Sequence, residues 1–301
     1  MKRHIWKKVF VLVLLAVLLL FGYSKGRAKL RKYRLRNTFN VAKIKAPVLE
    51  DKPFVVVVAS YKNEEFARKN LTSIFRQTHP NYRVIYIDDC SPDHTYDAVR
   101  EITAEYRMES RVKLIRNEEN QGALANLYNH IHTCNPNEIV VVLDGDDWFA
   151  NDNVLAKLNA YYANRKTWMT YGHYLYYPSY ERGVECQPMS YSTLKKGTAR
   201  SKPWVSSHLR TFYAGLFHKI KREDLMFDGK FFPTTYDLAI MYPMIEMARE
   251  HCCYTPDIFY IYNCDTPIND YKVRRSEQMF FEKYIRDLKV YPRLRAHPAQ
   301  E

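Results

Sequence analysis

Three aspartates lie within four residues, directly after an apolar run that is typical of a buried strand. Residues 144–147 read Asp-Gly-Asp-Asp and follow the apolar residues 139–143. Carboxylates this close repel one another unless a cation joins them, and hard oxygen ligands suit Mg²⁺ or Mn²⁺. Asp144 and Asp146 are therefore candidate metal ligands. The alternative is that an aspartate here caps a helix that would begin near Trp148.

A second acidic cluster follows another apolar run. Residues 88–93 read Asp-Asp-Cys-Ser-Pro-Asp and come after residues 84–87. Two such strand ends, placed side by side, could hold a nucleotide diphosphate and its metal. The alternative for Asp88 and Asp89 is a turn that caps a helix beginning near His94.

The apolar pattern predicts strands that alternate with helices. Continuous β-branched runs such as residues 54–58 are expected of parallel strands buried on both faces. Strands joined by helices imply right-handed crossovers, and ligands bind at the carboxyl ends of such strands. Ser60, Asp88 and Asp144 fall at those ends. The predicted strands are 54–58, 84–87, 112–115 and 139–143, and the predicted helices are 67–75, 96–106 and 124–131.

After residue 147 this alternation weakens. Residues 176–206 are rich in Tyr, Ser, Lys and Pro and predict a long loop, which in a compact domain is often a functional lid. The remaining pattern predicts helices over 154–162, 237–250 and 275–290 and strands over 168–171 and 258–262.

Basic residues are concentrated at the N-terminus. Of the 46 Lys and Arg residues, eleven lie in residues 1–36, which contain no acid, and this leaves 35 against 33 acidic residues in the rest of the chain. The folded body is therefore nearly neutral. A nucleic-acid-binding protein would need its basic residues on that body, so no nucleic-acid partner is expected.

The basic flanks surround an apolar segment, residues 9–23. Its length predicts a single-pass membrane anchor over residues 1–24, followed by a basic juxtamembrane tether over residues 25–52 that would lie on anionic headgroups. A cleaved signal peptide and a monotopic insertion are the alternatives. The larger charge of the second flank favours a membrane protein with a cytoplasmic body, although the side of the membrane stays open.

Two further features predict no chemistry. The six cysteines have no metal-binding spacing and are more typical of buried small apolar groups. Residues 70–72 read Asn-Leu-Thr, a glycosylation sequon, but they fall on a predicted helix, which favours a chance match.

The series of motifs resembles the family 2 glycosyltransferases over about residues 53–270. That family has the GT-A fold, an α/β, Rossmann-like, mostly parallel sheet flanked by helices. The resemblance rests on these segments in this order: Ala-Ser-Tyr-Lys-Asn-Glu at 59–64, Gln-Thr-His-Pro-Asn-Tyr at 77–82, the acidic cluster at 88–93, an Asn-x-Gly…Asn element at 117–126 and the Asp-x-Asp metal motif at 144–147.

The resemblance implies roles for particular residues. Donor-binding residues would be Ser60, Tyr61, Asn63, Asp88, Asp89, Asn120, Gly122 and Asp144, and Asp144 and Asp146 would hold Mn²⁺ or Mg²⁺. Residues 120–122 could instead form an ordinary turn with Gly122 at positive φ. The family carries its catalytic base in a Glu-Asp pair at a helix start. Here the pair is Tyr236-Asp237, so Asp237 is the candidate base and the Glu is missing; simple helix capping is its alternative role.

The implied reaction is an inverting, hexosyltransferase-type transfer from a nucleotide-diphosphate sugar to a hydroxyl of a glycan, lipid-linked or protein acceptor. A divalent cation would stabilise the leaving diphosphate. Residues 53–150 would form the nucleotide-sugar-binding half, and residues 151–301 the acceptor-binding half with a C-terminal helix.

The sequence fits two other classes of protein less well. A catalytically silent, membrane-anchored nucleotide-sugar-binding protein is the main alternative, and the intact Asp-x-Asp cluster argues against it. A nucleotidyltransferase would need a Gly-rich loop after the first strand, which residues 60–63 lack.

Overall fold

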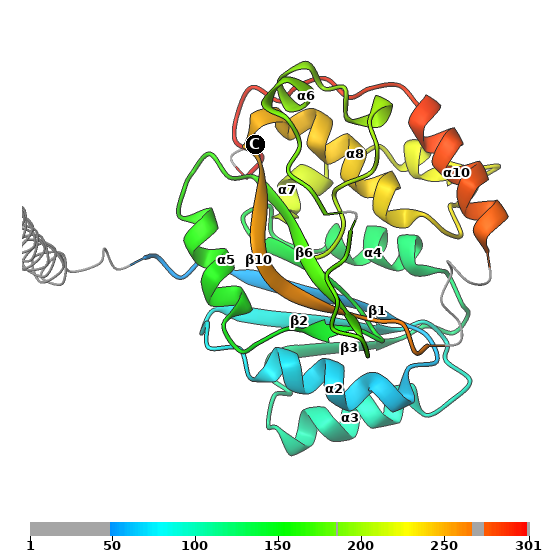
Figure 1. The fold of residues 1–301 in the computed structure, drawn as a ribbon. Coiled ribbons are helices and arrows are strands. Elements are labelled where there is room, and N and C mark those ends of the chain that lie inside the picture. The colour runs from blue at the N-terminus through cyan, green and yellow to red at the C-terminus, as the bar shows by residue number, and fades with distance from the viewer. Residues whose placement is uncertain (1–48, 185, 267–273, 300–301) are drawn as a thin grey trace, which may run out of the picture. The chain divides into compact units, whose positions relative to one another are not determined.

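One eight-stranded sheet runs through residues 49–184, 186–266 and 274–299, the parts that this computed structural model describes. The strands follow the order β3-β2-β1-β4-β7-β6-β10-β5 (Figure 1). Their bounds are β1 Phe54–Ser60, β2 Tyr82–Asp88, β3 Val112–Arg116, β4 Ile139–Asp144, β5 Trp148–Phe149, β6 Met169–Tyr177, β7 Arg210–Tyr213 and β10 Cys252–Asn263.

The first four strands are parallel, as predicted. Their alternate side chains face opposite layers, so both faces of the sheet are covered. Val55 and Val57 pack with α4 and α8, whereas Val56 and Val58 pack with α2 and α3. This two-sided burial explains the unbroken β-branched runs in the sequence.

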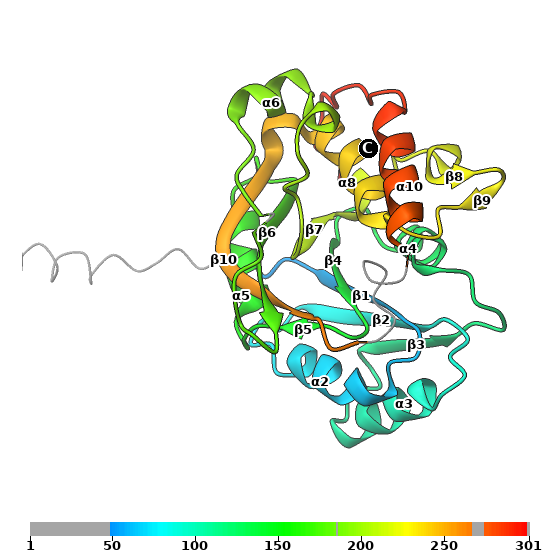
Figure 2. The same ribbon diagram turned by 45° about the vertical axis from the view of Figure 1, so that its right-hand side comes forward.

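The helices form a layer on each face of this half of the sheet. Helices α2 and α3 lie together on one side, and α4, α8 and α10 lie on the other (Figures 1 and 2). The bounds are α2 Glu64–Phe75, α3 Thr95–Glu105, α4 Ala123–Ile131, α5 Val154–Tyr162, α6 Tyr191–Lys196, α7 Ala214–Phe217, α8 Tyr236–Ala248 and α10 Arg275–Asp287.

The second half of the chain extends the same sheet with a different pattern. Strand β7, which the sequence did not predict, is antiparallel to both β4 and β6, while β10 is parallel to β6. A separate short hairpin joins β8, Met226–Phe227, to β9, Lys230–Phe231. The mixed α/β fold class is therefore confirmed, with antiparallel pairs added to a mostly parallel sheet.

One alternative and one prediction on local structure were wrong. Trp148 begins β5, which pairs with β10, so residues 144–147 do not cap a helix. The predicted long loop at 176–206 contains helix α6 and a short 3₁₀ helix, Ala199–Ser201. Strand β5 and helix α6 are both short. Their stabilising contacts come from distant segments, which sequence patterns do not reveal.

The predicted anchor and most of the predicted tether lie outside the described residues. Within the described part of the chain, no helix combines the length and the apolar character needed to cross a membrane.

Candidate active site

The carboxyl ends of β1, β2 and β4 lie side by side. Ser60 is level with Asp88 in the β1–β2 pair, and Ala59 is level with Asp144 in the β1–β4 pair. This edge of the sheet therefore brings together three of the residues that the sequence singled out, at the place where open α/β sheets bind ligands.

Ser60 and Asn63 are buried against the Asp-Gly-Asp-Asp turn. Ser60 Oγ accepts hydrogen bonds from Asn63 Nδ2 and from the Tyr86 hydroxyl, each at 3.1 Å. A Cβ atom at Gly145 would lie 2.4 Å from Ser60 Oγ, so a larger residue there would displace the turn. Ser60 and Asn63 thus position the turn, whereas Tyr61 is half-buried and stays a predicted contact of the donor base.

Asp88 is a buried carboxylate whose hydrogen-bonding capacity is largely unused. It has no exposed surface, and neither of its side-chain oxygens accepts a well-formed hydrogen bond from the described residues, although Ser91 faces it. The nearest cationic group is Arg116, with Nε 3.7 Å from Oδ2. Burial raises the pKa of Asp88 above its ordinary value. Buried polar atoms are normally bonded, so this carboxylate is suited to accept hydrogen bonds from a ligand.

Asp89 organises the loop that carries the Asn-Gln-Gly element. Its Oδ1 accepts hydrogen bonds from Asn117 Nδ2 at 2.7 Å and from the Gln121 N–H at 2.9 Å, and its Oδ2 accepts one from the Gly122 N–H at 2.8 Å. Its backbone oxygen accepts from Asn120 Nδ2 at 3.1 Å. Gly122 has φ +84°, as the turn interpretation expected. The described hydrogen bonds of Asp89, Asn120 and Gly122 thus hold this loop against the end of β2, and their donor-binding roles stay predictions.

Asn70 on α2 donates hydrogen bonds to the backbone of the Asp-Gly-Asp-Asp turn. Its Nδ2 donates to the backbone oxygens of Asp144 at 3.0 Å and Asp147 at 2.8 Å. Asn70 is completely buried. The sequon at residues 70–72 is therefore a chance match, because its asparagine is a structural hydrogen-bond donor.

Asp147 is buried and accepts hydrogen bonds from two residues of β10. Its Oδ1 accepts the Asn263 N–H at 2.7 Å, and its Oδ2 accepts the Tyr260 hydroxyl at 2.5 Å. Burial, together with the nearby Asp146 and Asp144, raises the pKa of Asp147 well above its ordinary value. Asp147 therefore anchors the turn to β10.

Asp144 is half-buried and lies between two tyrosines. Tyr236 donates its hydroxyl proton to Asp144 Oδ1 at 2.5 Å, and the Tyr260 oxygen lies 3.3 Å from Asp144 Oδ2. Arg210 Nη1 in turn donates to the Tyr236 hydroxyl at 3.3 Å. The turn is thus linked to the first residue of α8 and to β7.

Arg210 also connects this group to Asp237. The Arg210 Nη2 lies 3.6 Å from Asp237 Oδ2. Burial opposes the charged form of Arg210, but Tyr236, Asp237 and Asp144 raise its pKa above the ordinary value, so it remains a cation. Burial also raises the pKa of Asp237, while Arg210 acts in the opposite direction. A carboxylate with a raised pKa, in the first turn of α8, is suited to general-base work.

The donor set of the turn fits a hard divalent cation. Within the described ranges, no three or more His, Cys, Asp or Glu side chains form a group that could hold a metal ion. Asp144 and Asp146 are half-buried, and each Asp144 oxygen has a second lone pair beyond its tyrosine contact. Mg²⁺ usually takes one or two carboxylates plus substrate phosphates and water, and this pair offers that number.

Sequence reasoning missed two residues of this group. Tyr236 and Tyr260 contact the acidic turn from positions 92 and 116 residues away. The available signal for Tyr236 was its place directly before Asp237. Tyr260 lies in an apolar run, and no sequence pattern indicated a role for it in the site. Its hydroxyl reaches the acidic turn only because β10 pairs with β5.

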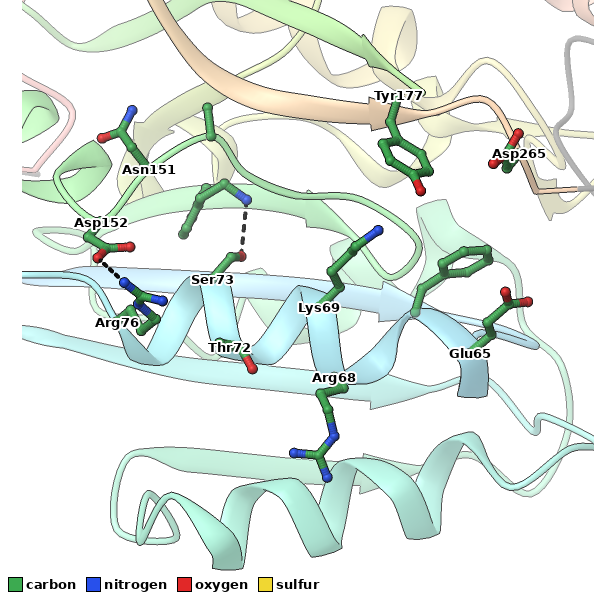
Figure 3. A pocket seen from close by; sticks show the side chains of 13 residues that line it. Glu65, Arg68, Lys69, Thr72, Ser73, Arg76, Asn151, Asp152, Tyr177 and Asp265 are labelled. Carbon is green, nitrogen blue, oxygen red and sulfur yellow. Dashed lines mark hydrogen bonds and ion pairs between the residues drawn. The ribbon is translucent and has the colours of Figure 1, made fainter. Parts of the chain in front are cut away.

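The structure also contains pockets away from this turn. A pocket of about 600 Å³ lies over α2 and β5, lined by Lys69, Tyr177 and Asp265 among others (Figure 3). It contains none of the predicted site residues. Another pocket, of about 630 Å³, is lined by Arg116, Asn117, Glu118, Glu119 and Gln121. It adjoins Asp88 and Asp89, which contact Arg116 and Asn117 of its lining.

Comparison with known proteins identifies similar sequences. The profile described as "Glycosyl transferase family 2" matches residues 55–223, more than half of the chain. The UDP-Glc:alpha-D-GlcNAc-diphosphoundecaprenol beta-1,3-glucosyltransferase WfgD of Escherichia coli is 31% identical over 104 residues. That match covers 34% of this chain and 39% of WfgD, so the chain matches less than half of that relative's length.

Solved structures share the fold. The Staphylococcus aureus protein TarS, residues 1–349 in complex with UDP-GlcNAc, has a TM-score of 0.51 and 20% identity, covering 79% of this chain and 68% of that one. The mannosyltransferase PcManGT of Pyrobaculum calidifontis, in complex with GDP-Man and Mn²⁺, has a TM-score of 0.53 and 21% identity, covering 82% of this chain and 70% of that one. At this level of identity the likeness concerns the fold.

Proposed function

Because this chain belongs to glycosyl transferase family 2, we propose that it transfers a sugar from a nucleotide-diphosphate sugar to an acceptor hydroxyl. The observation that carries the proposal is the linked set Asp144–Tyr236–Arg210–Asp237, which ties the acidic turn to the candidate base.

The donor would lie across the carboxyl ends of β1, β2 and β4. Asp88 would accept hydrogen bonds from the base or ribose, since its oxygens are buried and accept no well-formed hydrogen bond from the described residues. Two proteins of the same fold were solved with UDP-GlcNAc and with GDP-Man. These complexes support a nucleotide sugar as the donor.

Asp144 and Asp146 would hold the divalent cation, and Asp147 would support them from the sheet. When bound, Mn²⁺ or Mg²⁺ would neutralise the charge that develops on the leaving diphosphate. Arg210 supplies a buried cation on the other side of Tyr236. Asp144 is thereby placed between the predicted metal and a fixed positive charge.

Asp237 would remove the proton from the acceptor hydroxyl. The acceptor then attacks the anomeric carbon opposite the leaving diphosphate, which inverts the anomeric centre. The raised pKa of Asp237 makes it a stronger base than an exposed aspartate. Tyr236 occupies the place of the family's Glu and would hold the pair in position through Asp144.

The proposal extends to a glycan or lipid-linked acceptor and to a membrane location. WfgD is named for a diphosphoundecaprenol-linked acceptor, which supports a glycan or a lipid-linked sugar as the acceptor here. The apolar residues 9–23 and their basic flanks would tether the body to a membrane. The charge of the second flank favours a cytoplasmic body.

Donor hydrolysis provides a direct test. The full chain would be incubated with UDP-, GDP- and dTDP-sugars, with Mn²⁺ or with EDTA, and release of the nucleotide would be measured. We expect metal-dependent release with one donor, loss of release in Asp146→Ala, and no change in the control Asp97→Ala on the surface of α3. Donor binding by calorimetry without any release would instead identify the chain as the silent binding protein.

A further inference from the structure

A buried histidine, His208, contacts the cation of the candidate site. It lies two residues before Arg210, the first residue of β7, and only 7% of its surface is exposed. Arg210 is level with Val142 in the β4–β7 pair, two residues before Asp144. His208 therefore belongs to the segment that leads into the strand next to β4 (Figure 2).

The contact with Arg210 determines the protonation state of the imidazole. Arg210 Nη2 lies 3.2 Å from His208 Nε2. A guanidinium carries only donors, so Nε2 is the acceptor and the ring proton is on Nδ1. Burial lowers the pKa of His208 well below its ordinary value, and the charge of Arg210 acts in the same direction. His208 is therefore a neutral acceptor whose Nε2 lone pair is already bonded.

The guanidinium of Arg210 has few strong partners apart from His208. Its Nη1 lies 3.3 Å from the Tyr236 hydroxyl, and its Nη2 lies 3.6 Å from Asp237 Oδ2. Its Nε has no hydrogen-bond partner among the described residues. The side chain is only 3% exposed, so solvent cannot readily replace a lost partner. The bond to His208 thus helps to direct the guanidinium toward Asp237.

Three tyrosines from β6 and β10 surround the imidazole ring of His208. Tyr260 stacks on it, with ring centroids 4.3 Å apart and planes 17° apart. Tyr262 lies 5.4 Å away at 31°, and Tyr174 packs edge-on at 5.5 Å. Stacked and edge-on arrangements are the favoured geometries of aromatic rings. Packing therefore orients the ring and, with it, the lone pair that Arg210 uses.

The same stack reaches the acidic turn. The Tyr260 hydroxyl donates to Asp147 Oδ2 at 2.5 Å, and its oxygen lies 3.3 Å from Asp144 Oδ2. His208 thus contacts both the tyrosine that holds the acidic turn and the arginine that faces the candidate base. A displaced His208 ring would disturb both contacts.

We propose that His208 is a positioning residue that holds Arg210 beside Asp237. It acts through Arg210 and not on the substrate, because its Nε2 lone pair is bonded to Arg210 and its ring packs against tyrosines. Arg210, held in this place, opposes the rise in the pKa of Asp237 that burial causes. The inference rests on the proposed function, since it concerns the rate of sugar transfer.

Two substitutions separate this role from simple packing. His208→Phe keeps a flat ring for the stack on Tyr260 but removes the acceptor, whereas His208→Gln offers an amide oxygen near the position of Nε2. The full chain would be assayed for donor hydrolysis across pH, with whichever UDP-, GDP- or dTDP-sugar the native chain hydrolyses. Donor KM and kcat would be determined separately.

We expect kcat of His208→Phe to fall at least about tenfold, as when a charged group loses a buried hydrogen bond, with little change in donor KM. The acidic limb of its rate profile should move to higher pH, because a displaced Arg210 no longer lowers the pKa of Asp237. His208→Gln should recover the native position of the limb and most of the rate.

The matched control is His251→Phe. His251 also stacks on an aromatic ring, that of Trp168, with centroids 3.9 Å apart and planes 8° apart. It directly precedes Cys252 at the amino end of β10, eight residues before the level of Tyr260. Its rate and its acidic limb should stay native.

Other outcomes would overturn the proposal. An unshifted limb in His208→Phe, or equal losses of rate in His208→Phe and His208→Gln, would make His208 a packing residue only. A crystal structure of His208→Phe in which Arg210 keeps its distance from Asp237 would lead to the same conclusion without any activity measurement. If His208→Phe does not fold, His208→Asn takes its place, because its shorter amide cannot reach Arg210.

Failure of the proposed function would look different. A native chain that hydrolyses no donor would refute the transfer reaction, whereas the crystal structure of the variant would still decide whether His208 fixes Arg210. A native chain that is active beside a His208→Phe variant with native kinetics would refute the role of His208 alone.

Discussion

The hydroxyl of Tyr236 lies 2.5 Å from Oδ1 of Asp144, across 92 residues of sequence. This contact joins the helix that carries the candidate base to the turn that carries the candidate metal ligands. Tyr236 stands where the family has a Glu, and its hydroxyl replaces a charge with a hydrogen bond. The arrangement couples the two ends of the candidate site.

Replacement Tyr236→Phe should lower the transfer rate without unfolding the protein. Loss of a hydrogen bond to a charged group costs about 1.5–3 kcal/mol, which predicts a fall in kcat of at least about tenfold if Asp144 must be held in place. The measurement is donor turnover at saturating metal. The control is Tyr161→Phe, which removes a hydroxyl that donates to Asp257 at 2.8 Å, remote from the turn. Equal losses in both variants would argue against a positioning role for Tyr236.

The pH dependence of the rate should report Asp237. A general base works only when ionised, so the rate falls as the pH drops through its pKa. Burial already raises that pKa, and Arg210 opposes the rise. Replacement Arg210→Met should therefore move the acidic limb of the rate profile to higher pH, whereas Arg210→Lys should leave it near its native position. If neither variant shifts the limb, Asp237 is not the base.

Asp88→Asn should stabilise the fold and weaken donor binding. Burial raises the pKa of Asp88 in the folded protein, so the folded state binds this proton more tightly than the unfolded state. Its contribution to stability is then most favourable at low pH and is lost as the pH rises through the folded pKa. We expect a higher Tm than native at pH 8, with the difference shrinking toward acidic pH.

The matched control for Asp88 is Asp97→Asn, which removes a surface carboxylate that pairs with Arg100 at 3.0 Å. Thermal unfolding across pH and calorimetric titration with the nucleotide would be measured on both variants. A lower Tm in Asp88→Asn at pH 8, or unchanged donor affinity, would refute the role assigned to this buried carboxylate.

Asn70→Ala should loosen the acidic turn. It leaves two backbone oxygens, those of Asp144 and Asp147, without their donor, at a cost of about 1–3 kcal/mol in the free energy of unfolding. Mn²⁺ affinity should fall as well, because the turn loses its support. The comparison is Asn129→Ala, whose amide makes a 3.3 Å bond at the surface. Denaturant unfolding that shows the same stability for both would contradict this prediction.

A buried ion pair stabilises the C-terminal part of α8. Arg200 Nε lies 2.6 Å from Glu246 Oε1, and both side chains are buried. Replacement Glu246→Gln leaves a buried guanidinium uncompensated and should cost about 3–5 kcal/mol. The exposed pair of Lys283 and Asp287 offers the comparison, and Asp287→Asn should leave the denaturation midpoint unchanged. Similar midpoints for the two variants would rule out this role for Arg200 and Glu246.

Much of the sheet could be predicted from sequence, because its signals are local. The β-branched run at β1 and the helical spacing along α2 each follow from neighbouring residues. Strand β7 could not be predicted this way, since its four residues are stabilised by pairing with β4 and β6. Short strands depend on their partners more than on their own pattern.

Strand periodicity and chain direction are enough to predict that Asp88 and Asp144 end parallel strands at the same edge of the sheet. The surroundings of each carboxylate became known from the folded chain. Asp89 is bonded to the loop that follows β3, Asp147 is enclosed by β10, and Asp88 is buried with Arg116 as its ion-pair partner. Hydrogen bonding and burial depend on side chains far away in sequence. These contacts, rather than the residue type, determine the charge of an aspartate and whether it is free to contact a ligand.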